Sequence, residues 1–162
     1  MTHLYQQSLS TYASQQVEMA SPEQLLLMLY DGAIRFMNEA MRAHGESDLE
    51  TYNNKLIKTQ DIISELMSSL DMTMGGVLAD NLFRLYEYLH YRLVQANVKK
   101  DLAMLEEVLV HMKDLRSTWQ QAIEIAKREE RGQREEQESV TSQTQTPEDS
   151  SSEVPVERSF SA

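Results

Sequence analysis

The residues that come closest to a catalytic or metal-binding pattern are Glu87 and His90, three positions apart in the segment E-Y-L-H. Helical bundles that bind two iron ions use this Glu-x-x-His spacing on two helices and take one further glutamate from each of the other two. This chain has the motif once. None of the remaining histidines follows a glutamate by three residues: His3, His44 and His111. We therefore expect no metal site, and we expect His90 to be a groove or boundary residue.

Other catalytic signals are weaker still. Gly75-Gly76 is a bare turn and lacks the pattern of a phosphate-binding loop, and no serine lies in a recognised nucleophile context. The absence of cysteine excludes a disulfide scaffold, a thiolate metal site and a cysteine nucleophile. The sequence predicts neither an enzyme nor a bound cofactor.

Composition favours a protein or peptide partner. The 162 residues suit one domain, and the net charge of −11 leaves no basic stripe for nucleic acid or anionic lipid. No apolar run approaches the roughly 18 residues needed to cross a membrane. The first 16 residues lack the basic start and apolar core of a signal peptide. We expect a cytoplasmic protein without membrane insertion.

Four segments carry helical signals. The first should run from about residue 22 to 43, with Ser21 as N-cap, Pro22 in the first turn and Gln24 completing a capping box. Its apolar stripe is wider than a surface helix needs. A second capping box, Ser47 with Glu50, should open the next helix.

The third helix should begin after Gly75-Gly76 and stop near Asn97, and Asp101 should cap a fourth helix that ends near residue 128. Apolar residues recur at steps of three and four in each segment, for example Leu78, Leu82, Leu85 and Leu89 in the third. Helices of about 20 residues joined by short turns predict an all-α, antiparallel four-helix bundle over residues 21–128.

The two ends of the chain look different. Residues 1–20 should form a mostly irregular arm in which a short helical turn is allowed. Residues 129–162 hold nine acidic residues and three arginines, a net charge of −6, and are rich in Ser, Thr and Gln. The fourth helix has room to fray through residues 129–138. We nevertheless predict a disordered acidic tail from residue 129, because so polar a segment buries too little surface to offset its ordering entropy.

Four motifs in order resemble the flagellar secretion chaperone (FliS) family. They are SPEQLLLMLYDGA (21–33), KTQDIISEL (58–66), LYEYLHYRLVQAN (85–97) and WQQAI (119–123). The resemblance covers about residues 9–126 and implies a small acidic chaperone that is not an enzyme. It implies a client, the C-terminal segment of newly made flagellin, together with the flagellar export apparatus, and it leaves room for other flagellar regulators.

The family's arm carries an aromatic or aliphatic residue followed three positions later by a tyrosine, which here are Leu9 and Tyr12. The acidic extension after Arg128 has no counterpart in the family pattern. Ile57 and Val110 lie off the main apolar stripes of their helices, and the ten methionines are either core filler or an adaptable binding surface. We expect nine partner-binding residues: Leu9, Tyr12, Ile57, Ile62, Tyr86, His90, Met104, Val108 and Val110.

Two alternatives from other classes stay open. One is a bundle enzyme with a buried metal, which the single Glu-x-x-His motif disfavours. The other is a self-associating structural bundle, in which the surplus apolar stripe closes a weak homodimer.

Overall fold

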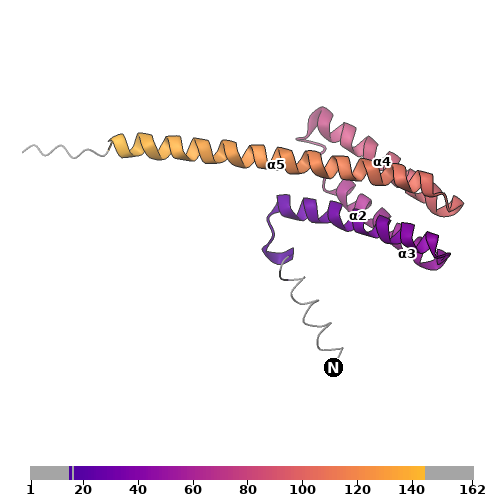
Figure 1. Cartoon of the computed structure of the whole chain (residues 1–162). Helices are drawn as coiled ribbons and strands as arrows, with labels where there is room; N and C mark the ends of the chain where they lie inside the picture. The colour runs from indigo at the N-terminus through magenta and orange to yellow at the C-terminus, as the bar shows by residue number, and fades with distance from the viewer. Residues whose placement is uncertain (1–14, 16, 145–162) are drawn as a thin grey trace, which may run out of the picture. The chain divides into compact units, whose positions relative to one another are not determined.

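The computed structural model describes residues 15 and 17–144, and this part of the chain is helical, without a β-strand (Figure 1). A helical turn over residues 17–19 precedes the labelled helices, which are α2 (Pro22–Gly45), α3 (Leu49–Ser68), α4 (Gly76–Lys99) and α5 (Leu102–Thr144). The predicted all-α bundle of four helices is confirmed. The described residues up to Ile123 form one compact unit, and those from Glu124 onward form a second.

The start of α2 is built as predicted. The Gln24 backbone N–H donates to the Ser21 hydroxyl oxygen at 3.2 Å, and the Ser21 N–H donates to Gln24 Oε1 at 3.0 Å. Pro22 occupies the first turn, where a missing N–H costs no hydrogen bond. This reciprocal capping box fixes where the helix begins.

The predicted cap of the second helix is wrong by one residue. Asp48, not Ser47, caps α3, since its Oδ1 accepts from the Thr51 N–H at 3.1 Å. Ser47 lies in the preceding turn with φ 58°, and the Asp48 N–H donates back to the Ala43 carbonyl at 2.8 Å. A carboxylate also interacts favourably with the positive end of the helix dipole.

The end of α4 also lies beyond the prediction. The helix continues past Asn97 to Lys99, and Lys100 takes the left-handed conformation with φ 52°. Asp101 caps α5 as predicted, because its Oδ1 accepts from the Ala103 N–H at 2.9 Å. The two turns that join α2 to α3 and α4 to α5 are therefore both tight.

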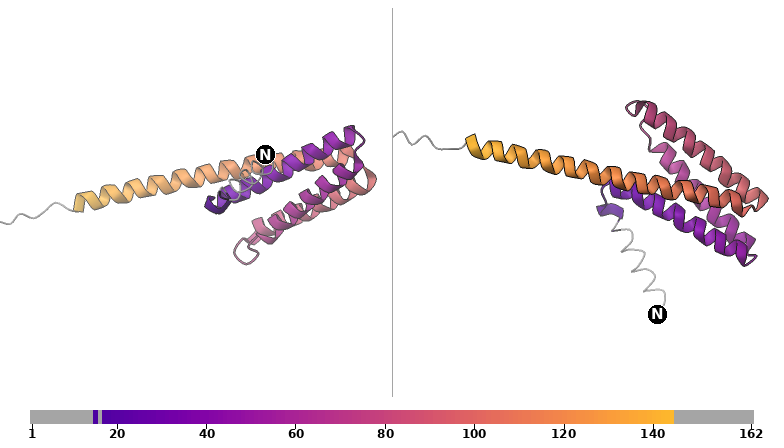
Figure 2. Two further views of the ribbon diagram at one scale, coloured as in Figure 1. Left: turned by 90° about the horizontal axis from the view of Figure 1, so that it is seen from below. Right: turned by 45° about the horizontal axis from the view of Figure 1, so that its top comes forward.

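The core lies between the apolar stripes of the helices. α2 packs beside α3, and α3 packs beside α4 (Figure 2). On α4 the buried face passes through Ala79 and not through Leu78, whose side chain is 64% exposed. That face consists of Ala79, Leu82, Tyr86, Leu89, Leu93 and Ala96.

The last helix is longer than the sequence predicts. Residues 129–144 belong to α5, so the predicted disorder does not begin at residue 129. Glu, Gln and Arg are strong helix formers, and Glu130 and Arg134 are spaced to pair across one turn. Every side chain from Glu124 to Thr144 is exposed, which explains why no apolar periodicity marks this segment. The rest of the predicted tail, residues 145–162, lies outside the described residues.

Candidate binding surface

The nine predicted partner-binding residues fall into five groups, according to where the structure places them. Leu9 and Tyr12 lie outside the described residues. Tyr86 and Val108 lie in the core, 1% and 0% exposed, so the prediction that their side chains form part of a surface is corrected. Two apolar stripes run side by side along such a helix, and residue spacing alone does not reveal which of the two is buried.

Ile62 and Met104 are partly buried and pack against the core. The Ile62 Cδ1 atom lies 3.3 Å from the position that a Cβ atom on Gly32 would take. The glycine thus permits α2 and α3 to approach closely, and Ile62 is largely a packing residue.

Ile57 on α3 and Val110 on α5 are 43% and 57% exposed. Their position off the main stripes led us to expect this exposure. Isolated aliphatic residues on a surface are common. These two side chains are accessible to a partner without any change in the bundle.

His90 lines a shallow groove of about 360 Å³ between α3 and α4. Its prediction as a groove residue is therefore confirmed. The lining is mixed, with polar and apolar side chains: Ser64, Met67, Glu87, His90, Tyr91 and Val94. Within the described part of the chain, no three residues of the His, Cys, Asp or Glu types gather closely enough to hold a metal ion.

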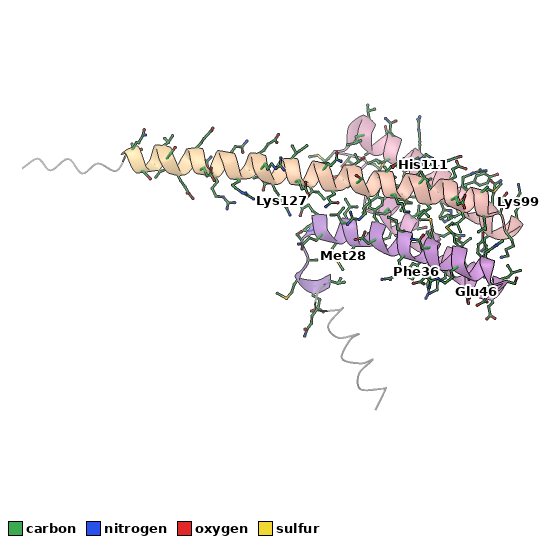
Figure 3. All side chains as sticks on the ribbon, in the orientation of Figure 1. Met28, Phe36, Glu46, Lys99, His111 and Lys127 are labelled. Carbon is green, nitrogen blue, oxygen red and sulfur yellow. The ribbon has the colours of Figure 1, made fainter. Side chains whose placement is uncertain are left out.

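A larger groove of about 680 Å³ lies at the beginning of α2, and sequence reasoning did not single it out. The sequence did contain a signal for this groove, because the apolar stripe of α2 is wider than one buried face of a helix requires. Met28 is labelled in Figure 3 near this end of the helix, whereas Glu46 and Lys99 lie near the opposite end of the bundle. The lining residues are Val17, Pro22, Leu25, Leu26, Met28, Leu29, Glu65 and Ser69.

The turn between α3 and α4 presents a second apolar surface that the sequence analysis missed. The Asp71 side chain orders it by accepting hydrogen bonds from the Thr73 N–H at 3.0 Å, the Thr73 hydroxyl at 2.7 Å and the Met74 N–H at 3.1 Å. These bonds also lower the pKa of Asp71. Four exposed apolar side chains flank this turn: Met72, Met74, Val77 and Leu78.

The ten methionines therefore divide between the two interpretations. Met37 and Met112 are fully buried and fill the core. Met74 is 84% exposed, and Met19, Met28 and Met72 are also exposed. Thioether side chains on a surface adapt to partners of different shape.

Polar contacts hold α5 to its neighbours. The Tyr30 and Tyr86 hydroxyls are hydrogen-bonded to each other, and Trp119 Nε1 donates to the Tyr30 hydroxyl at 3.2 Å. Burial raises the pKa of both tyrosines, so the pair is neutral in the folded protein. This network joins α2, α4 and α5 inside the bundle.

On the surface of α4 and α5, Glu107 accepts two bonds from Arg92, at 2.7 and 3.1 Å, and one from the Tyr88 hydroxyl at 2.5 Å. These hydrogen bonds, that of Tyr88 first, lower the pKa of Glu107. Arg116 of α5 similarly binds Asp31 of α2 through an ion pair. Both clusters join neighbouring helices, since Glu107 and Asp31 bind side chains from another helix.

The sequence profile of a family described as "Flagellar protein FliS" matches residues 5–126. The chain belongs to the FliS family. A flagellar secretion chaperone FliS of Bacillus subtilis strain 168 is 38% identical over 123 residues, which are 76% of this chain and 91% of that protein. A flagellar secretion chaperone FliS of Salmonella typhimurium strain LT2 is 36% identical over 118 residues, 70% of this chain and 87% of that protein.

A crystal structure of a flagellar chaperone from bacteria has the same fold, with a TM-score of 0.60. It is 19% identical and covers 74% of this chain and 97% of its own. The FliS match ends within α5, at residue 126, so the helical segment 127–144 lies beyond the family region. Among the described helices, none is long and apolar enough to cross a membrane.

Proposed function

We propose that this FliS-family chain is a flagellar export chaperone that binds the C-terminal segment of flagellin in the cytoplasm. It prevents premature polymerisation of flagellin and delivers it to the flagellar type III export apparatus. Membership of a family whose curated relatives are named flagellar secretion chaperones carries this proposal. The apolar surface left over by the bundle gives it a physical basis.

A terminal segment that assembles through apolar contacts has to be covered while the protein is still inside the cell. An amphipathic helix can lie in an apolar groove between two helices and bury its apolar face there. Coupled folding and binding of this kind buries on the order of 1,000–3,000 Å². Because binding is driven by burial, the chaperone needs neither a cofactor nor a catalytic step.

The α3–α4 groove around His90 and the exposed Ile57 supports a client site on that face. Val110 offers a further apolar contact on α5. Leu9 and Tyr12 are proposed as client contacts from the arm. Tyr12→Ala should weaken client binding by roughly 1–3 kcal/mol if its ring is a buried anchor.

Isothermal titration calorimetry of the full chain against two flagellins tests this function. Intact flagellin should bind one-to-one, and flagellin without its C-terminal segment should not bind. Binding should survive about 1 M salt, where the Debye length is near 3 Å, because screening affects charge pairs more than apolar burial. Equal binding of both flagellins, or loss of binding at high salt, would contradict the proposal.

The alternative is a self-associating bundle without a flagellin client. The exposed Val77 and Leu78 side chains favour this second candidate, since they could pack against a second copy. Light scattering separates the two. A chaperone should shift from monomer to a one-to-one complex when flagellin is added, whereas a structural bundle should form the same oligomer with or without it.

A further inference from the structure

We propose that the groove at the beginning of α2 is a second binding site, which takes an amphipathic helix that carries basic side chains along the edges of its apolar face. This activity goes beyond the proposed chaperone function, because it concerns a different groove. It does not depend on flagellin being the client.

The shape and lining of this groove suit a helix. Its volume is about 680 Å³, and its lining consists mostly of apolar side chains from successive turns of α2 and of Val17, with Glu65 and Ser69 at the end of α3. Leu26 and Leu29 are anchored by packing against the core. Met28, 39% exposed, adds an adaptable thioether at the surface. A groove of this kind accepts apolar anchors spaced three and four residues apart on a partner helix.

The charged residues in the lining stretches of the groove have one sign. These two stretches, residues 17–29 and 65–69, contain no Lys, Arg or His. They contain three acidic residues: Glu18, Glu23 and Glu65. Glu65 itself lines the groove. Complementary charge at the edge of an apolar site steers a partner and selects its register.

These carboxylates are largely available to a partner. None of the ion pairs among the described residues involves Glu18, Glu23 or Glu65. An apolar floor with unpaired acids at its rim selects a basic amphipathic helix over a neutral or acidic one.

Other occupants lack this complementarity. A second copy of the chain carries the same net charge of −11 and presents the same acidic rim. Residues 1–14 of this chain offer leucine and tyrosine but no lysine or arginine. Neither can satisfy Glu65 and its neighbours as a Lys- or Arg-bearing helix does.

Fluorescence anisotropy of the full chain with three labelled 18-residue peptides tests the proposal. The first peptide is an amphipathic Leu/Lys helix. The second has Glu in place of every Lys, and the third has the composition of the first in an order without helical periodicity. The first should bind at least about tenfold more tightly than either of the others, which corresponds to about 1.4 kcal/mol.

Matched variants separate the groove from the general negative charge. Glu65→Lys should weaken the Leu/Lys peptide about 3- to 10-fold, whereas Glu106→Lys, an exposed acid on α5, should change it less than twofold. Met28→Gln should weaken binding about tenfold, and Val98→Gln, at an exposed position near the end of α4, should leave it unchanged. All four positions are exposed, and unchanged thermal unfolding monitored by circular dichroism checks that each variant is folded.

Four results would overturn the proposal. Equal binding of the periodic and aperiodic Lys peptides, or equal effects of Glu65→Lys and Glu106→Lys, would show unspecific attraction to an acidic protein. Binding that appears only after deletion of residues 2–14 would make the chain's own arm the occupant. A dimer that Met28→Gln dissociates, seen by sedimentation, would assign the groove to a second copy.

Discussion

The two ends of the bundle are built in opposite ways. The closed end comprises the turn from Gly45 to Asp48 and the turn from Lys100 to Asp101. The open end comprises the start of α2 at Pro22 and the turn from Ser69 to Gly75. Polar contacts join the helices at the closed end, while apolar side chains are left uncovered at the open end.

At the closed end, hydrogen bonds cross from one helix to another. The Tyr52 hydroxyl donates to the Ala96 carbonyl at 2.8 Å, and Asn97 Nδ2 donates to Asn53 Oδ1 at 2.6 Å. His44 Nε2 lies 2.9 Å from the Lys100 carbonyl oxygen. These hydrogen bonds join α3 to α4, and they join α2 to the turn at Lys100.

In the turn from Ser69 to Gly75 at the open end, the side-chain hydrogen bonds are local. Those of Asp71 stay within its own turn, and the side chains of Met74 and Val77 contact little. The exposed apolar side chains of the open end are therefore available for the second binding site that we propose, whereas the closed end is expected to contribute more to stability.

The largest effect is expected from Tyr52→Ala. The ring is fully buried, and its hydroxyl holds α3 against the end of α4. Loss of both the packing and the bond should lower the free energy of unfolding by about 3–5 kcal/mol. Urea denaturation followed by circular dichroism measures this. A loss below about 1 kcal/mol would mean that the closed end does not hold the fold together.

The next largest effect is expected from alkaline pH, which should lower the free energy of unfolding through Tyr52 at the closed end. Burial, with the Asp101 carboxylate nearby, raises the pKa of Tyr52 to about 12 from the ordinary 10.0. A raised folded-state pKa means that the contribution is complete below pH 10 and is lost as the pH rises towards 12. The wild type should therefore lose on the order of 2 kcal/mol relative to Tyr52→Phe over this interval. Parallel stability curves for the two proteins between pH 9 and 12 would refute it.

At the open end, a double substitution of Met72 and Met74 by serine should hardly affect stability. Both side chains are exposed, so the free energy of unfolding should change by less than about 0.5 kcal/mol. Urea denaturation again provides the measurement, with Met37→Ser in the core as the control that unfolds readily. A large loss would show that the open end is packed after all.

The smallest effect is expected from ending the chain at Arg128. Residues 129–144 are helical but wholly exposed, so neither end of the bundle depends on them. The truncated protein should lose the helical signal of that segment and keep its melting temperature within about 3 °C. Differential scanning calorimetry decides, and a fall of 10 °C would mean that this helix stabilises the bundle.

Much of the fold was predictable because it depends on local rules. The Ser21–Gln24 capping box and the Asp101 cap each need only residues within one turn. Their positions follow directly from residue type and spacing. The same rules misplaced the α3 cap, because whether Ser47 or Asp48 caps depends on how the preceding turn folds back onto Ala43.

The binding surface was predicted less well, for a different reason. Periodicity finds an apolar stripe but not its edges. Tyr86 was therefore predicted on the surface but is buried, whereas Leu78 lies on the predicted stripe but is exposed. The groove beside Leu25 arises where α2 extends beyond full coverage by its neighbours. Coverage of that kind is a property of the assembled helices and not of any one segment.

The bond between Trp119 and Tyr30 has an optical consequence. Trp119 is the only tryptophan in the chain, and it is partly buried where α5 meets α2. Its emission therefore reports on this single contact, against a background of seven tyrosines that selective excitation of the indole avoids. A red shift would record the separation of α5 from α2 even when the helices themselves stay intact.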